Sequence, residues 1–179
     1  MMQQPGSAEQ QKRRLTFILG GARSGKSAHG EGLIARLPPP WIYVATAEAR
    51  DEDMHARIKA HQQRRDARWQ LREVPLKLPE ALASLPDDLP VLIDCLTLWL
   101  SNIMLADVDL EDHCDRLVAA LQRPRGPWVV VSNEVGLGIV PDNALARRFR
   151  DQAGRLNARV AALAQQVDFM VAGLAMRMK

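Results

Sequence analysis

The sequence predicts an α/β fold, a three-layer α/β/α sandwich with a mostly parallel central sheet. Short apolar runs recur along the chain, and the segments between them are long enough to form helices. The runs do not alternate between apolar and polar residues, which is typical of strands buried on both faces of a parallel sheet. Right-handed crossovers would place the intervening helices on both faces. The five runs are Leu15–Leu19, Trp41–Thr46, Pro90–Cys95, Trp128–Ser132 and Phe169–Leu174.

Length and composition fit one domain of ordinary size. The chain has 179 residues, of which 47% are hydrophobic and 25% are charged, a balance that is typical of a globular protein. Residues 1–12 are polar and are expected to form a flexible tail, so that residues 13–179 form a single domain. The formal net charge of +3 is too small to indicate a nucleic acid as a partner.

Three features predict a cytoplasmic protein. The N-terminal tail lacks the apolar core of a signal peptide. Polar residues such as Asp94 and Asn102 interrupt the longest apolar stretch, residues 91–106, so no membrane span is expected. Cys95 and Cys114 lack the spacing of a metal site, and two free thiols are compatible with a reducing compartment.

A glycine-rich segment directly after the first apolar run carries the strongest chemical signal. Residues 20–27 read GGARSGKS, the G-x-x-x-x-G-K-S pattern of a phosphate-binding loop, and a helix is expected from Ala28 to Arg36. In a strand–loop–helix context the backbone N–H groups and the helix dipole favour a phosphate. Lys26 is expected to reach the β- and γ-phosphates, and Ser27 to hold Mg²⁺. The domain is therefore expected to be P-loop NTPase-like. The nucleotide-binding residues predicted here are Gly20, Gly21, Ala22, Arg23, Ser24, Gly25, Lys26 and Ser27.

Polar side chains follow two further runs. In parallel α/β sheets ligands lie beyond the carboxyl ends of the strands. Asp94 ends the third run and is predicted to be the second Mg²⁺ group, although it could instead cap the next helix. Asn133 and Glu134 follow the fourth run, where a substrate or a magnesium-bound water would be met, although a structural turn is an alternative.

His61 has two interpretations from the residues alone. A helix is expected from Asp51 to about Arg68, with acids at its start and arginines at its end. His61 shares one face of this helix with Met54 and Ile58. The histidine therefore either packs in the core or serves as a nucleophile or acid–base group that faces the phosphate loop.

The remaining helices are more ordinary. Leu96–Ala106 is expected to be a buried helix or an oligomer contact, and Leu110–Gln122 an amphipathic helix. A long helix is expected from about Asn143 to Gln166, with an apolar stripe and several arginines on its other faces. Those arginines either form a solvated face or bind an anionic substrate. His29 is expected at the surface.

Three segments together resemble a known family. They are GGARSGKS at residues 20–27, YVATAEARDEDMHARIKAH at residues 43–61, and SNEVGLGIVPDNALARRFRDQAGRLN at residues 132–157. The family is that of the bifunctional adenosylcobinamide kinase/adenosylcobinamide-phosphate guanylyltransferases of cobalamin biosynthesis, and the resemblance covers Leu15 to Lys179. It implies an enzyme that phosphorylates adenosylcobinamide with ATP or GTP. The enzyme would then transfer GMP from GTP through a guanylylated histidine, giving adenosylcobinamide-GDP and pyrophosphate.

The resemblance also implies roles for individual residues. The family's guanylylated histidine falls in an R-I-x-x-H element, here residues 57–61, so His61 is the expected catalytic residue together with Lys26. Some members have a second histidine directly before it, where this chain has Ala60, and some have Glu where Asp94 stands. Ser27 and Asp94 are the expected metal ligands. Further nucleotide-binding positions are Thr46, Ala47, Glu48, Gln62, Gln63, Arg64, Arg65, Glu73 and Asp94.

The implied partners are adenosylcobinamide, adenosylcobinamide phosphate, GTP, ATP and Mg²⁺, in a homotrimer. Two alternatives stay open from the residues: a P-loop small-molecule kinase without the guanylyltransferase step, and a non-catalytic nucleotide-binding switch. The chain has no N-K-x-D motif, so it does not read guanine as a Ras-type GTPase does.

Overall fold

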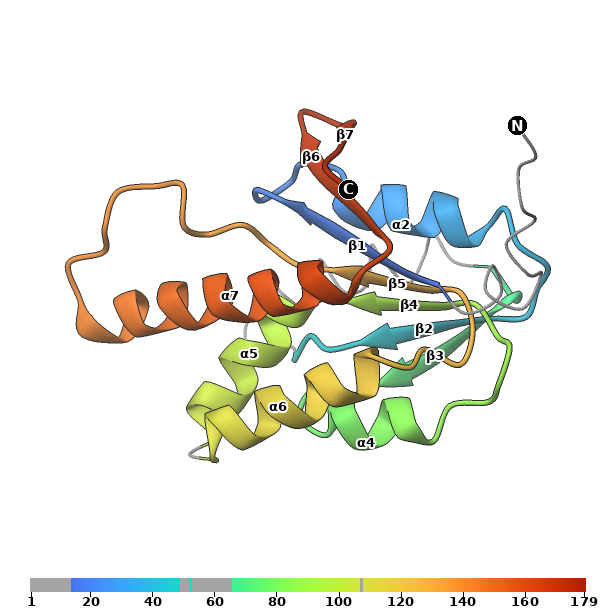
Figure 1. Ribbon diagram of the computed structural model, residues 1–179, viewed down its shortest axis with the longest axis horizontal. Coiled ribbons are helices and arrows are strands. Elements are labelled where there is room, and N and C mark those ends of the chain that lie inside the picture. The colour runs from blue at the N-terminus through green and yellow to red at the C-terminus, as the bar shows by residue number, and fades with distance from the viewer. Residues whose placement is uncertain (1–13, 49–51, 53–65, 107) are drawn as a thin grey trace, which may run out of the picture.

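The computed structural model of the chain describes residues 14–48, 52, 66–106 and 108–179. One seven-stranded sheet has the order β3-β2-β4-β5-β1-β6-β7 (Figure 1). Every neighbouring pair is parallel except β6 and β7. The predicted α/β fold with a mostly parallel sheet is therefore confirmed. The strands are β1 Leu15–Gly20, β2 Trp41–Ala45, β3 Trp69–Glu73, β4 Val91–Asp94, β5 Trp128–Val131, β6 Gln166–Val171 and β7 Leu174–Arg177.

Helices cover both faces of the sheet (Figure 1). Of the helices that the structure describes, α2 (Lys26–Ile34) lies on one face. The other face carries α4 (Leu78–Ala83), α5 (Leu96–Leu105), α6 (Leu110–Leu121) and α7 (Ala144–Leu163). None of these helices combines the length and the apolar character that a membrane span needs.

The apolar runs arise because the central strands have a hydrophobic core on each side. Neighbouring residues of β1 point to opposite faces, so that Phe17 joins the larger core and Ile18 the smaller one. Trp99 of α5 packs in the first core, and Ile34 of α2 in the second. A strand with two buried faces needs apolar residues at successive positions, which removes the alternation of a half-exposed strand.

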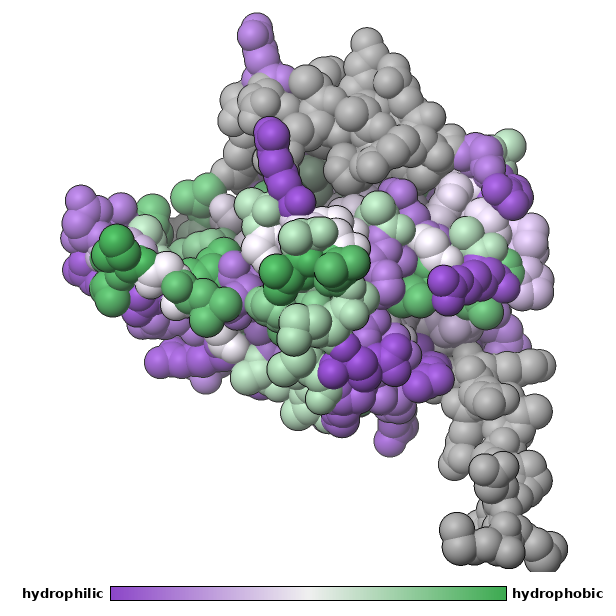
Figure 2. All heavy atoms as spheres, turned by 90° about the horizontal axis from the view of Figure 1, so that it is seen from above, coloured by the Kyte–Doolittle hydropathy of each residue, from purple (hydrophilic) through white to green (hydrophobic). Residues whose placement is uncertain are grey.

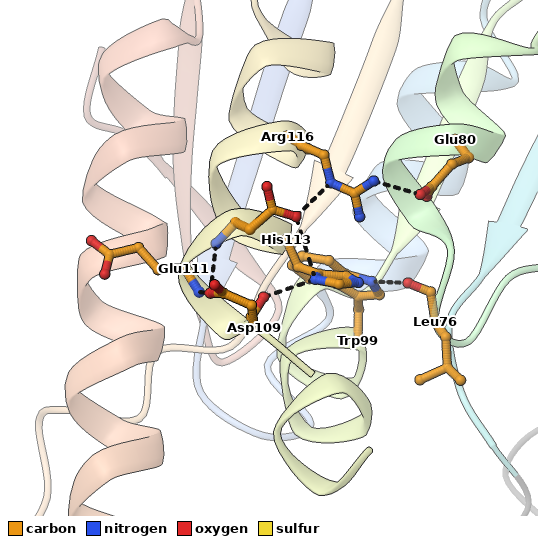
Figure 3. A network of polar contacts seen from close by, with 8 residues as sticks. Leu76, Glu80, Trp99, Asp109, Glu111, His113 and Arg116 are labelled. Atoms are coloured by element: carbon orange, nitrogen blue, oxygen red, sulfur yellow. Dashed lines mark hydrogen bonds and ion pairs between the residues drawn. The ribbon is translucent and has the colours of Figure 1, made fainter. Parts of the chain in front are cut away.

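A polar network joins the helices on the face opposite α2 (Figure 3). The Asp109 carboxylate accepts hydrogen bonds from two backbone N–H groups in the first turn of α6 and so caps that helix. Arg116 of α6 pairs with Glu80 of α4 at 2.8 Å. The indole N–H of Trp99 donates to the carbonyl oxygen of Leu76 at 2.8 Å. These contacts connect α4, α5 and α6 into one layer.

Two strand predictions were incomplete. The run Phe169–Leu174 is not one strand, because the chain turns at Ala172 and Gly173, whose φ angles are 50° and 82°. This tight turn sends β7 back antiparallel to β6. Sequence reasoning also missed β3, because that strand lies at the edge of the sheet and has mostly exposed side chains. An edge strand that faces solvent does not need an apolar run.

Two helix boundaries differ from expectation. The long helix α7 ends at Leu163, before the predicted Gln166, because Ala164 has an extended backbone and Gln166 begins β6. The predicted helix from Asp51 to Arg68 lies mostly outside the described residues. Its predicted end is wrong, since residues 66–68 lead through a turn into β3.

Gly30 lets α2 lie close to the sheet. A Cβ atom on Gly30 would lie 2.9 Å from Cδ1 of Leu92 and 3.4 Å from Cδ1 of Ile18. Both of those side chains are completely buried and cannot move away without disturbing the core. The close contact fixes the height of α2 above the strands.

We predict opposite effects for two substitutions on this helix. Gly30→Ala should lower the free energy of unfolding by about 1–3 kcal/mol, because the added methyl group overpacks the core. Gly32→Ala is the matched control: a Cβ there meets nothing within 4 Å, so alanine should stabilise the helix by about 0.5–1 kcal/mol. Urea unfolding of both variants measures the difference. Equal effects at the two positions would contradict the proposed close packing.

Candidate functional site

The segment between β1 and α2 adopts the expected phosphate-loop shape. A Cβ atom on Gly20 would lie 2.5 Å from the carbonyl oxygen of Met170, so only glycine fits there. Gly25 directly precedes α2 and has a φ of 96°, in the left-handed region that favours glycine. Lys26 and Ser27 then form the first turn of α2. The glycines of the sequence pattern are thus explained by close approach and by backbone conformation.

Lys26 lies inside this loop. Its Nζ atom donates a hydrogen bond to the carbonyl oxygen of Gly21 at 2.5 Å, and the residue is 7% exposed. Burial lowers the pKa of Lys26, although the neighbouring Cys95 and Asp94 act in the opposite direction. Ser24 Oγ is buried and has no hydrogen-bond partner among the described residues. One loop thus carries an ammonium group and an unsatisfied buried hydroxyl, and both are groups that a phosphate would satisfy.

Asp94 ends β4 close enough to Lys26 to influence its charge. The hydroxyl of Tyr43 donates to Oδ2 of Asp94 at 2.8 Å and fixes the orientation of the carboxylate. The alternative role of Asp94 as a helix cap is not supported: Cys95 is the N-cap of α5, and no side chain caps that helix. Sequence reasoning missed Tyr43, because its approach to Asp94 depends on the register between β2 and β4.

The oxygen atoms at the carboxyl ends of the strands fit Mg²⁺ better than a metal whose ligands all come from protein side chains. Within residues 14–48, 52, 66–106 and 108–179, no group of three or more His, Cys, Asp and Glu side chains forms a metal site. Mg²⁺ usually takes one or two protein oxygens and completes its coordination with phosphates and water. The Ser27 hydroxyl and the Asp94 carboxylate are hard oxygen donors of this kind.

Cys95, the residue next to Asp94, is chemically quiet. Burial raises the pKa of its thiol to about 12, so the thiol stays protonated at neutral pH. The backbone of Cys95 also exchanges two hydrogen bonds with the hydroxyl of Thr46, at 2.7 and 2.8 Å. The buried Thr46 side chain is therefore engaged within the protein, and its contact with a nucleotide stays a prediction.

The strand register places Glu73 in the same row as Asp94. Ala45 of β2 pairs with Glu73 on one side and with Asp94 on the other. Two strand spacings separate the carboxylate-bearing residues, or about 10 Å between their Cα atoms. Ala47 and Glu48 follow β2 at the same edge. The carboxyl ends of β2, β3 and β4 thus carry several of the predicted nucleotide-binding residues.

The loop after β5 lies beside the phosphate loop. The backbone N–H of Glu134 donates to the carbonyl oxygen of Gly20 at 3.0 Å. The N–H of Asn133 donates to the hydroxyl of Thr97 at 2.6 Å, and the amide of Asn157 donates to the Asn133 carbonyl at 3.1 Å. These contacts hold the polar pair at the position that the sequence predicted.

The other predicted site residues belong to one segment of the chain, between β2 and β3. His61, Gln62, Gln63, Arg64 and Arg65 lie outside the described residues. The structure brings Asp94 close to Lys26 and places Ser27 in the first turn of α2, while the catalytic role of His61 stays a prediction.

His29 was expected at the surface, but the structure places it beside a buried carboxylate. It is half-buried, and its Nε2 atom lies 3.0 Å from Oδ2 of Asp168 on β6. Burial alone would raise the pKa of the Asp168 carboxyl, but hydrogen bonds from His29, Arg177 and Gln166 outweigh it and hold that pKa below its usual value. The available signal was an acid inside an apolar strand, at Val167-Asp168-Phe169.

Comparisons with solved structures identify the fold. An ATPase from the type III secretion system of pathogenic bacteria aligns with a TM-score of 0.55 at 13% identity, over 92% of this chain and 56% of that chain. A protein from Pyrococcus horikoshii OT3 aligns with a TM-score of 0.54 at 8% identity, over 93% of this chain and 86% of that chain. At these identities the likeness shows the fold alone.

Sequence comparisons reach further. The chain is 39% identical to the bifunctional adenosylcobalamin biosynthesis protein CobU of Salmonella typhimurium, over 92% of this chain and 99% of that protein. It is 44% identical to the protein CobP of Pseudomonas aeruginosa, which has the same description, over 91% of this chain and 96% of that protein. The model of one family matches residues 16–178. The chain therefore belongs to the cobinamide kinase / cobinamide phosphate guanyltransferase family.

Proposed function

We propose that this enzyme phosphorylates adenosylcobinamide with ATP or GTP and then transfers GMP from GTP to the phosphorylated product. The final products are adenosylcobinamide-GDP and pyrophosphate. The observation that carries this proposal is the buried Lys26 of the phosphate loop, close to Asp94, in a chain of this family. That the substrate carries an adenosyl group is taken from the family resemblance described above.

The phosphate loop would serve the kinase step by positioning and by charge. The substrate hydroxyl attacks the γ-phosphorus, and the nucleoside diphosphate leaves. Lys26 and the backbone N–H groups at the start of α2 neutralise the charge on the phosphate oxygens. Since Lys26 is buried, water screens its charge little. A bound Mg²⁺, held by Ser27 and Asp94, would add positive charge at the same oxygens.

His61 would act in the second step. Its neutral imidazole attacks the α-phosphorus of GTP, a phosphorus–nitrogen bond forms, and pyrophosphate leaves. A phosphate oxygen of adenosylcobinamide phosphate then attacks the same phosphorus and releases the imidazole. The support is the R-I-x-x-H element at residues 57–61, which lies inside the region that the family model matches.

We propose a homotrimer in the cytoplasm. GTP and ATP are cytoplasmic metabolites, and the free, buried Cys95 and Cys114 are compatible with a reducing compartment. Leu137 and Ile139, in the loop after β5, are 82% and 96% exposed. Figure 2 shows hydrophobic atoms gathered at this end of the molecule, and such exposed apolar groups favour contact with another subunit.

The covalent intermediate provides the decisive test. Incubation with α-labelled GTP and Mg²⁺, followed by denaturation and gel separation, should leave label on the wild type. The bond should resist base and break in acid, as phosphoramidates do. His61→Ala should carry no label, because the attacking nitrogen is gone. His113→Gln, at a half-buried histidine on α6, is the matched control and should retain it. Absence of label in the wild type across several pH values would instead favour a plain kinase.

Lys26→Ala should impair both steps, since one phosphate loop serves them. We expect each rate to fall about a hundredfold or more, because a buried charge is lost from the transition state. The two assays are phosphorylation of adenosylcobinamide and release of pyrophosphate from GTP. Lys77→Ala, at an exposed residue before α4, should leave both rates unchanged. Near-normal turnover of Lys26→Ala would show that the loop is not the nucleotide site.

Asp94→Asn should change the use of magnesium. The substitution keeps the size of the side chain and removes its charge, so the Mg²⁺ concentration for half-maximal activity should rise about tenfold or more. Tyr43→Phe, which removes the hydroxyl that orients the carboxylate, should give a smaller shift in the same direction. A magnesium titration measures both variants. An unchanged titration for Asp94→Asn would remove this residue from the metal site.

A further inference from the structure

The C-terminal hairpin, formed by β6, β7 and the tight turn between them, is one wall of the phosphate loop. The N–H of Gly173 in the turn donates to the carbonyl oxygen of Ser24 at 3.0 Å. A Cβ atom on Gly25 would lie 3.3 Å from Cα of Gly173, and one on Gly20 would lie 2.5 Å from the carbonyl oxygen of Met170. The hairpin therefore contacts the loop at both of its ends.

Hydrophobic burial contributes little to holding β7 in place. All four of its residues are exposed, including Leu174 at 72% and Met176 at 56%. Figure 2 shows the face of the molecule that carries the hairpin, where hydrophobic atoms are exposed to solvent. Among the strands that the structure describes, β7 pairs only with β6. An element with so little buried apolar area depends on its hydrogen bonds.

The buried carboxylate of Asp168 joins β7 to the helix that follows the phosphate loop. Its Oδ1 atom accepts from Nε of Arg177 on β7 at 2.6 Å. Its Oδ2 atom accepts from Nε2 of His29 at 3.0 Å and from Nε2 of Gln166 at 2.8 Å. His29 lies on α2, within one turn of Lys26. Hydrogen bonds to a buried, ionised group are among the stronger ones in proteins.

We propose that Asp168 is a positioning residue for nucleotide binding. By holding β7 and α2 to one carboxylate, it keeps the Gly173 amide against the phosphate loop and so fixes the position of Lys26. The inference rests on the proposed function only in taking the ligand of the loop to be a nucleotide phosphate. Asp168 acts through the loop and not on the substrate.

The test compares nucleotide affinity with stability. Asp168→Ala should weaken the binding of GDP with Mg²⁺ to the folded protein by about ten- to a hundredfold, since small displacements of phosphate-binding groups have large effects. Calorimetry below the unfolding temperature measures this. The KM for GTP should rise to a similar extent, while the KM for adenosylcobinamide stays within about twofold. Asp168→Asn should fall between the wild type and alanine, because its amide oxygen still accepts a hydrogen bond.

Two further variants separate positioning from a loss of stability. Val160→Ala removes buried volume from α7, so it should lower the unfolding temperature and leave the Kd for GDP of the folded protein unchanged. Combining His29→Ala with Asp168→Ala should weaken GDP binding no further than Asp168→Ala alone, because both changes break one connection. A wild-type Kd in folded Asp168→Ala would overturn the proposal. A wild type that binds GDP but never turns over adenosylcobinamide would overturn the proposed function alone.

Discussion

The hydrogen bond from Lys26 to the Gly21 carbonyl is the interaction on which the arrangement of the site depends. It holds the ammonium group against the backbone of the phosphate loop, where burial removes most of its water. A buried ammonium group is stable only while its hydrogen-bond partner stays in place, so the surrounding chain must be fixed. The close approach of Gly20 to β6, the left-handed Gly25 and the depth of α2 set by Gly30 each fix part of it. Three features thus fix the phosphate loop and the helix that follows it. Gly20 and Gly25 belong to the sequence motif, and Gly30 does not.

Much of the fold could be predicted because burial on both faces leaves a direct record in the sequence. The strands β1, β2, β4 and β5 appear as apolar runs, and the loop motif marks the start of α2. The edge strands β3 and β7 leave no such record. Strand β3 needs few apolar residues, and the turn that separates β7 from β6 lies inside one apolar run. The sequence could also place Asp94 at the end of a strand. It could not show that Tyr43 orients Asp94, because that contact depends on the pairing register of two strands.

The predicted site divides along the same line. Residues of the motif, such as Lys26 and Ser27, were predicted from their spacing alone, and the loop after β5 was predicted from its place behind a strand. The pair of His29 and Asp168 was missed, because its members lie far apart in the chain and neither stands in a motif. Membership in the family rests on similarity along nearly the whole chain. The contacts that hold the loop join residues far apart in the sequence, and only the structure brings them together.

The position of β1 in the sheet has a consequence for the order of events during synthesis. This strand is made early, yet its two neighbours are β5 and β6, and its residue Leu15 pairs with Trp128, more than a hundred residues later. Until those strands emerge from the ribosome, β1 lacks both of its partner strands, and Gly20 lacks the Met170 backbone that it packs against. Such distant pairing makes folding slow. A nascent chain therefore carries the complete phosphate-loop motif long before it can acquire a phosphate-binding shape.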